Sequence, residues 1–336
     1  MKKLFLGVLA IVLLCSHDMF LKLDNYFLEP NTQAAIQLFN GTFEKSENVI
    51  DRNRMLDVSL LGNGKRIQVD STQWTEKDSI TFLNFKSGLP GTWVAGVSTA
   101  PRNIALDATA FNDYLEHDGV VDMLEWRKQN NALDQDAVEK YSKHVKTIFQ
   151  VGDKISDDWS NALGYPIEFI PLANPYDLHP GHSLKVKLLF NGVPLANQLV
   201  IIGSEETAEN TPVEHSHDGG EPHTHQNSEA ADHDHTSGLQ LRTDEKGVLD
   251  FQIASQGVRH LRTIYMVESE EDGLTHESNW ATLTFAVGSG HSAEHDNEHT
   301  ENDHAHEEEG FSSYIFLIVS LIIVAALFFY FKRKKK

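Results

Sequence analysis

Residues 55–69, MLDVSLLGNGKRIQV, contain two short runs rich in apolar side chains on either side of the turn sequence Gly62-Asn63-Gly64. The runs Met55–Leu61 and Arg66–Val69 have the length of β-strands, and glycine with asparagine is typical of tight turns between strands. This stretch therefore predicts neighbouring strands of an antiparallel sheet.

Similar runs continue on both sides of this stretch, again separated by turn signals such as Asn40-Gly41 and Leu89-Pro90-Gly91. They are Met19–Leu28, Ala34–Phe39, Ser79–Phe85 and Thr92–Ser98. Between Asp107 and Gln150 the apolar residues change to helical spacing. Val138, Tyr141, Val145, Ile148 and Phe149 follow this spacing. We expect a β-rich domain over 17–165 that ends in two or three helices packed on the first sheet.

A second set of strands is expected downstream, in a domain covering 166–288. It begins at Ile167 and includes Ser183–Asn191, Gln198–Ile202, Leu239–Arg242, Val248–Ile253, Leu261–Glu268 and Trp280–Val287. Seven short strands in roughly 120 residues fit an immunoglobulin-like or transthyretin-like sandwich. The predicted fold class is mainly β, with two β-sandwich-type domains and a short helical segment between them.

The two ends of the sequence predict where the protein resides. Residues 1–16 are typical of a signal peptide, with Lys2 and Lys3 before an apolar stretch and Ser16 as a small residue for cleavage. Acylation of Cys15 is the alternative, although Leu14 stands where a small residue is expected. Residues 311–331 are long and apolar enough for one C-terminal transmembrane helix, and the basic tail 332–336 is expected to stay in the cytoplasm. This predicts a single-pass inner-membrane protein whose body lies in the periplasm.

The charge balance favours cationic ligands. The 336 residues carry 28 Lys and Arg against 49 Asp and Glu, a net charge of −21. Removing Lys2, Lys3 and the five basic residues of 332–336 leaves 21 Lys and Arg against 49 Asp and Glu. The part of the protein expected outside the cytoplasm therefore has a net charge of about −28. This charge does not favour a nucleic-acid ligand, because phosphate contacts need a basic face. A single cysteine excludes a disulfide framework.

Histidine is the unusual component of this composition, with 18 residues, many of them in two acidic segments. The insertion 204–238 has nine acids, six His and no Lys or Arg, and the linker 289–310 is similar. Paired His at two-residue spacing occur at His215/His217, His223/His225, His233/His235 and His304/His306. Imidazole suits divalent zinc, nickel, cobalt and copper. We expect several weak sites that exchange ions; the alternative is a solvated acidic spacer.

Other histidines are candidates on different grounds. If cleavage follows Ser16, His17 would offer both its free amine and its imidazole to one ion, with further ligands from His117 or His144. His179 and His182 flank Pro180-Gly181 in a predicted turn, where ordinary turn polarity explains them better than chelation.

Catalytic patterns are weak, and we expect no enzyme. His295-Asp296-Asn297-Glu298-His299 has zinc-protease spacing but lies in an acidic tract without an apolar face. Gly96-Val97-Ser98-Thr99-Ala100 approximates a nucleophile elbow, but Pro101 opposes the required strand-to-helix turn. Gly62-Asn63-Gly64-Lys65 lacks the rest of a phosphate-binding loop.

An ordered series of motifs gives the sequence a family resemblance. It comprises His17-Asp18-Met19-Phe20, Gly96–Arg102, Phe111–Gly119, Tyr141–Lys146, Gln150–Gly152, Glu168–Pro171 and Asn191–Leu195. These resemble the bacterial extracytoplasmic domain-of-unknown-function family 4198, often grouped with periplasmic components of nickel and cobalt uptake. The resemblance implies a secreted β-rich domain followed by a carboxypeptidase-regulatory-like sandwich.

Together these observations predict a membrane-anchored binding protein that captures or buffers transition-metal cations, in support of uptake by a separate membrane transporter. The alternative is a non-enzymatic envelope scaffold or adhesion protein that binds protein or glycan, with the His-rich loop as a spacer.

Overall fold

The computed structural model describes residues 17–206 and 238–288, which belong to one compact unit. Two helices are present in these residues, α1 (Ala108–His117) and α2 (Val121–Gln129). The strands of the first half are β1 (Asp18–Lys22), β2 (Phe27–Leu28), β3 (Gln33–Gly41), β4 (Met55–Gly62), β5 (Lys65–Gln68), β6 (Trp74–Lys77), β7 (Ile80–Lys86), β8 (Gly91–Thr99), β9 (Arg102–Leu106) and β10 (Ala137–Val151). Those of the second half are β11 (Ile167–Pro171), β12 (Ser183–Phe190), β13 (Val193–Pro194), β14 (Leu199–Glu206), β15 (Leu239–Arg242), β16 (Val248–Gln252), β17 (Gly257–Glu268) and β18 (His276–Val287).

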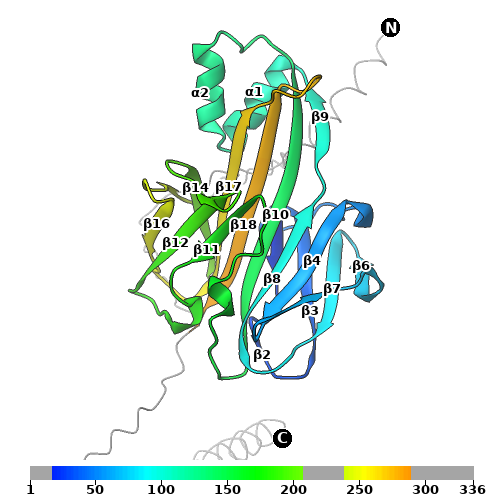
Figure 1. Cartoon of the computed structure of the whole chain (residues 1–336), viewed down its shortest axis with the longest axis vertical. Helices are drawn as coiled ribbons and strands as arrows, with labels where there is room; N and C mark the ends of the chain where they lie inside the picture. Colours follow the sequence, from blue (N-terminus) through cyan, green and yellow to red (C-terminus); the bar gives the residue numbers. More distant parts are fainter. Residues whose placement is uncertain (1–16, 207–237, 289–336) are drawn as a thin grey trace, which may run out of the picture. The chain divides into compact units, whose positions relative to one another are not determined.

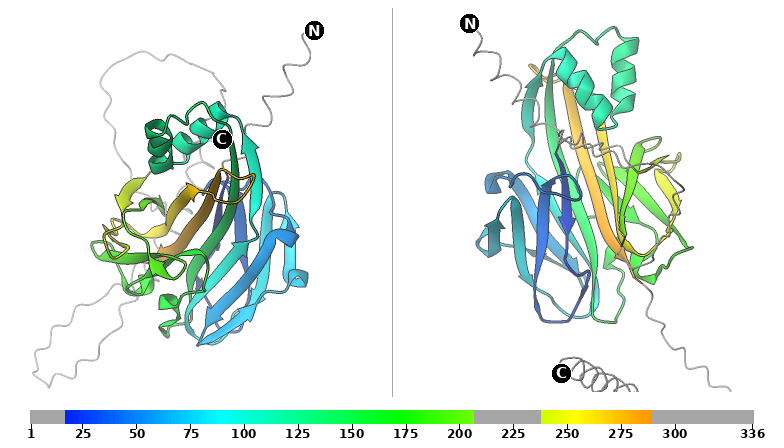
Figure 2. Two further views of the ribbon diagram at one scale, coloured as in Figure 1. Left: turned by 45° about the horizontal axis from the view of Figure 1, so that its top comes forward. Right: turned by 180° about the vertical axis from the view of Figure 1, so that it is seen from behind.

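These strands form three sheets (Figure 1). A four-stranded sheet has the order β1-β3-β7-β6, and a second small sheet joins β11, β12, β13 and β16. Between them runs a ten-stranded sheet with the order β15-β14-β17-β18-β10-β8-β4-β5, in which β2 and β9 also pair with β10. The two small sheets lie on opposite faces of the long one, as the front and back views show (Figures 1 and 2).

The hairpin predicted at residues 55–69 is confirmed. Gly62 of β4 pairs with Lys65 of β5, and the two residues between them, Asn63 and Gly64, both have positive φ, at 52° and 71°. This is the conformation of a type I′ turn, which Asn-Gly adopts at low cost and which matches the twist of the flanking strands. The other expected strand runs also fall on strands of the structure, except that Met19–Leu28 is divided between β1 and β2, which belong to different sheets.

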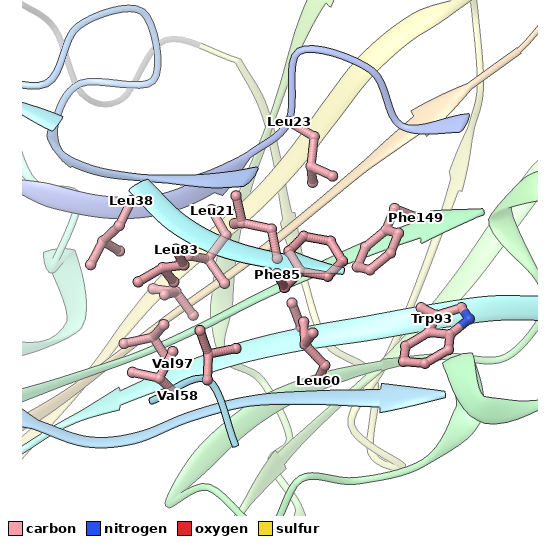
Figure 3. Packing of buried hydrophobic residues seen from close by; sticks show 14 of the residues in the cluster. Leu21, Leu23, Leu38, Val58, Leu60, Leu83, Phe85, Trp93, Val97 and Phe149 are labelled. Carbon is pink, nitrogen blue, oxygen red and sulfur yellow. The ribbon is translucent and has the colours of Figure 1, made fainter. Parts of the chain in front are cut away.

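Two hydrophobic cores hold the sheets together. In the first, Leu21, Leu38, Leu83 and Phe85 of the β1-β3-β7-β6 sheet pack on one face of the long sheet (Figure 3). The facing residues labelled there are Val58, Leu60, Trp93, Val97 and Phe149. In the second core, the β11-β12-β16 strands cover the other face of the long sheet, against residues such as Val94, Ile148 and Leu283.

The strands β8 and β10 are therefore buried on both faces. Trp93 and Val94 are consecutive in β8, yet they belong to different cores. The same is true of Ile148 and Phe149 in β10. Side chains alternate between the faces of a strand, so each neighbouring pair divides between the two cores.

The helical spacing of Val138–Phe149 was misleading, because these residues lie in β10 and not in a helix. A strand covered on both faces loses the apolar and polar alternation of a half-exposed strand. The apolar residues that remain can then match a helical period by chance. The two helices that do form, α1 and α2, precede β10 and pack on Ala137, Ile264, Met266 and Trp280 of β10, β17 and β18.

The predicted domain boundary at 165/166 falls between β10 and β11, and the ten-stranded sheet contains strands from both sides of it. The signal peptide, most of the insertion 204–238, the linker 289–310 and the span 311–331 lie outside the described residues. Among the helices that are described, none is long and apolar enough to cross a membrane.

Candidate functional site

A cavity of about 260 Å³ opens beside the start of β1. Its lining comes from the residue before β1, the end of β3, the segment between β3 and β4, the start of β9 and the middle of β10. The lining residues are His17, Asn40, Asn48, Val49, Ile50, Asp51, Arg54, Arg102, Tyr141 and Lys143. Asn40, Ile50 and Lys143 are buried, whereas Asn48, Val49, Asp51 and Arg102 are exposed, so the cavity has a buried base and an exposed rim.

Lys143 forms part of the base. Its ammonium donates a hydrogen bond to the backbone carbonyl of His17 and lies 3.5 Å from Oδ1 of Asn40. It also lies 4.8 Å from the ring centroid of Trp280, within cation–π range. Burial lowers the pKa of Lys143 to about 8, partly offset by the charge of Asp18. The side chain is therefore still mainly a cation at neutral pH.

His17 lies at the same cavity, and its side chain is mostly buried. Its Nδ1 lies 3.4 Å from the carboxylate of Glu47, and its Nε2 lies 3.4 Å from Nδ2 of Asn48. The carboxylate of Glu47 is thus a neighbour of the imidazole that the sequence did not indicate.

His144 does not face this cavity, because it projects from the opposite side of β10 to Lys143. Its ring nitrogens lie 2.9 Å from the hydroxyl of Ser98 and 3.0 Å from that of Ser142. Burial lowers the pKa of His144 to about 4. A neutral, hydrogen-bonded core histidine is the role that this geometry supports.

The other histidine candidates among the described residues, His117, His179 and His182, do not line the cavity. His117 is exposed at the end of α1, and the rings of His179 and His182 lie 5.5 Å apart without a third metal-ligating neighbour. Across residues 17–206 and 238–288, no group of three or more His, Cys, Asp and Glu side chains comes together. The eight paired histidines, His215, His217, His223, His225, His233, His235, His304 and His306, lie outside the described residues.

A buried polar network continues inward from the cavity. Arg262 of β17 lies with its Nε 2.6 Å from Oδ2 of Asp18, and its Nη1 donates to the backbone carbonyl of Asp118 at the end of α1. Glu139 of β10 accepts hydrogen bonds from the hydroxyls of Tyr114 and Ser278. Burial raises the pKa of Glu139 to about 7, although the two hydroxyl groups favour its charged form. The network ties β1, α1, β10 and β17 together.

Four of the motifs that carry the family resemblance meet here. The motif His17-Asp18-Met19-Phe20 places His17 at the cavity and Asp18 in an ion pair with Arg262. The motif Gly96–Arg102 supplies Arg102. The motif Phe111–Gly119 supplies Asp118, and the motif Tyr141–Lys146 supplies Tyr141 and Lys143. Sequence reasoning singled out only His17 as a candidate ligand among the cavity residues. Arg102 and Lys143 appeared there only as members of these motifs, and the lining residues between β3 and β4 belong to none of the motifs.

The weak catalytic patterns have structural explanations. Gly96–Thr99 is part of the continuous strand β8, which is followed by β9 rather than by a helix, so no nucleophile elbow forms. Gly62-Asn63-Gly64-Lys65 is the hairpin turn between β4 and β5.

The described chain is thus a mainly β protein of stacked sheets with a polar cavity at one end of its first small sheet. Residues 14–267 match the family described as "Domain of unknown function (DUF4198)", and the chain belongs to that family. No curated protein matches the sequence.

Several solved structures show weak similarity. Salmonella alpha-2-macroglobulin reacted with methylamine is 9% identical with a TM-score of 0.20, over 82% of this chain and 15% of that one. The Yersinia pseudotuberculosis adhesin InvE is 13% identical with a TM-score of 0.19, over 81% and 58%. A DUF4785 family protein from Legionella pneumophila is 10% identical with a TM-score of 0.21, over 72% and 51%. This chain spans less than two thirds of each of these proteins, and similarities at these TM-scores carry no conclusion here.

Proposed function

We propose that this protein captures transition-metal cations outside the cytoplasm on its two acidic, His-rich segments, 204–238 and 289–310. A C-terminal helix holds it at the membrane, and a separate membrane transporter receives the ions. Nickel and cobalt, zinc and copper all suit imidazole ligands. We favour the first two, because the family resemblance implies an association with nickel and cobalt uptake.

The position of the first segment in the fold supports this proposal most directly. Ile202 of β14 pairs with Leu239 of β15, so two neighbouring strands of the long sheet flank the insertion. β14 then continues along β17 as far as Glu206, where the described residues stop. Residues outside 207–237 form the pairing of β14 with β15, so this pairing does not itself fix the length or composition of the insertion. Its composition can instead serve ligand binding.

The composition itself fits capture rather than a closed structural site. Nine acids and six His without a single Lys or Arg concentrate cations and provide many equivalent ligands. Such a segment is expected to bind several ions weakly and to exchange them quickly. Protons compete for the imidazoles, so binding should fade below about pH 6.

His17 provides a second point of capture if the signal peptide is cleaved after Ser16. The α-amine and imidazole of one residue can chelate a single ion, and Glu47 already lies 3.4 Å from Nδ1 of His17. Amine, imidazole and carboxylate would give three ligands from two residues. Intact-mass analysis of the mature protein tests this directly, because a chain that starts elsewhere excludes the chelate.

The decisive experiment is calorimetric titration of the full chain in detergent with nickel, cobalt, zinc and copper at pH 7.4 and pH 5.5. The matched variant replaces the six His of 204–238 by Asn and keeps all nine acids. We expect most of the ion capacity at pH 7.4 to disappear in this variant, and that of the wild type to fall strongly at pH 5.5. Circular dichroism and the unfolding midpoint should not change.

Unchanged capacity in the six-His variant would contradict capture by the insertion. If the six-His variant retains one tight site, titration of the His17→Ala variant shows whether His17 forms that site. Absence of binding in the wild type would overturn metal capture altogether and favour the envelope scaffold.

A further inference from the structure

The sign of the charge around the cavity is opposite to that of the protein. Arg54, Arg102 and Lys143 line it, against one lining carboxylate, Asp51. The nearest approach of Asp51 to Arg102 is 3.8 Å, and their side chains are 64% and 58% exposed, so this ion pair is weak. A cationic cavity on a chain of net charge −21 is not a consequence of overall composition.

The cationic groups have donor capacity to spare. Nη2 of Arg54 donates to the carbonyl of Ala100, but its buried Nε has no hydrogen-bond partner among the described residues. An unsatisfied buried donor costs about 1–3 kcal/mol. The guanidinium group also lies 5.1 Å from the ring centroid of Tyr141, within cation–π range. Lys143 is desolvated at the base, and both cations would gain from an anionic acceptor.

The rest of the lining is partly apolar. Ile50 and the ring of Tyr141 contribute carbon surface next to the charged groups, and Val49 does the same at the rim. An inorganic anion would leave this surface in contact with water, whereas an organic anion would cover it. The volume of about 260 Å³ lies below the usual range for drug-sized ligands, so the organic part must be small.

We propose that this cavity binds a small organic carboxylate, with its carboxylate at Arg54, Arg102 and Lys143 and its carbon skeleton on Ile50 and Tyr141. Arginine forks hold carboxylates through paired hydrogen bonds, and Lys143 adds a point charge at the base. This inference does not depend on metal capture, because none of the three cationic residues is a metal ligand at neutral pH.

The test uses the full chain in detergent, stripped of metal by a chelating resin, with succinate as the probe. Two rim variants carry opposite predictions and avoid the buried residues. Arg102→Gln removes a cationic donor and should weaken succinate binding about tenfold. Asp51→Asn removes the competing carboxylate and should tighten binding about threefold. Arg52→Gln is the matched control, because Arg52 is a nearby arginine that contacts Glu76, Ser71 and Trp74 and does not line the cavity.

Acetate, inorganic phosphate and sulfate are titrated beside succinate. The proposal expects saturable succinate binding that exceeds the binding of both inorganic anions, with affinity unchanged in Arg52→Gln. Equal affinity for succinate, phosphate and sulfate would overturn the assignment to an organic ligand. Absence of saturable binding, or equal affinity in Arg102→Gln and Asp51→Asn, would overturn the site itself.

Discussion

The ammonium of Lys146 lies 3.0 Å from the carboxylate of Glu168, and the side chains are only 1% and 3% exposed. The pair joins β10 of the long sheet to β11 of the small sheet that covers it. Glu168 also accepts hydrogen bonds from the backbone N–H groups of Leu163 and Gly164, and Lys146 donates to the carbonyl of Phe169. Both charged groups therefore have several hydrogen-bond partners in the buried contact between the two sheets.

Lys146→Met should destabilise the protein by about 3–5 kcal/mol, because it leaves a buried carboxylate without its counter-ion. Glu168→Gln removes the charge but keeps an acceptor. The double variant should lose less than the sum of the two single changes, by about 1–3 kcal/mol. Urea unfolding of the four proteins measures this coupling, and additivity within 0.5 kcal/mol, about the usual scatter for independent sites, would show that the pair is not coupled.

Glu139→Gln should stabilise the protein at alkaline pH. Burial raises the pKa of Glu139 to about 7 in the folded state from 4.5, so the folded protein binds a proton that the unfolded chain releases. The stability contributed by this group is present below about pH 4.5 and is lost as the pH rises through 7. Glutamine resembles the protonated form. Its effect relative to wild type should therefore be more favourable at pH 8 than at pH 5, by roughly 2 kcal/mol.

Urea unfolding at both pH values checks this prediction. A difference between Glu139→Gln and wild type that does not change from pH 5 to pH 8 would mean that Glu139 is ionised in the folded protein throughout this range.

Three core histidines should make the protein sensitive to acid. Burial lowers the pKa values of His144, His260 and His276 to about 4 from 6.5. Between these values the unfolded chain binds more protons, so stability falls as the pH drops from 6.5 towards 4. Glu139 has the opposite effect, because the folded protein binds its proton more tightly than the unfolded chain does. Three histidines outweigh this one carboxyl group, so acid still destabilises the protein.

His144→Gln isolates one of these contributions, since glutamine keeps a donor and an acceptor for Ser98 and Ser142. The loss of stability between pH 7 and pH 5 should be smaller in this variant by about 2 kcal/mol. Unfolding free energies at the two pH values measure it, whatever the variant costs at neutral pH. An identical loss in both proteins would exclude His144 as a source of acid sensitivity.

The strands could be predicted wherever one face of a strand is more polar than the other or a turn marks its end. Asn63-Gly64 illustrates this, because its backbone conformation is a local property of two residues. β10 could not be predicted in the same way. Its burial on both faces is a result of tertiary packing, and polar residues such as Lys146 are tolerated there only because Glu168 lies across the sheet interface.

The cavity was equally inaccessible to sequence reasoning. Arg54, Arg102 and Lys143 are separated by tens of residues, and each has ordinary neighbours in the chain. The pairing of β9 with β10 places Arg102 near Lys143, and hydrogen bonds between Arg54 and Ala100 hold Arg54 beside the start of β9. His17 was singled out because it directly follows the predicted cleavage site, and an N-terminal histidine would have a distinctive chemistry that does not depend on the fold.

Gly96→Ala should destabilise the protein by about 1–3 kcal/mol, although alanine favours a strand no less than glycine does. A Cβ at position 96 would lie 2.3 Å from Cδ1 of Leu163 and 2.5 Å from the hydroxyl of Tyr165. Tyr165 cannot retreat easily, because its hydroxyl donates to Asp57 at 2.6 Å. Leu163→Ala removes one of the two clashing groups, so the double variant should lose less stability than the two single losses added together. Thermal unfolding of the four proteins tests this. Strictly additive losses of stability would show that a clash with Leu163 is not the reason why alanine destabilises position 96.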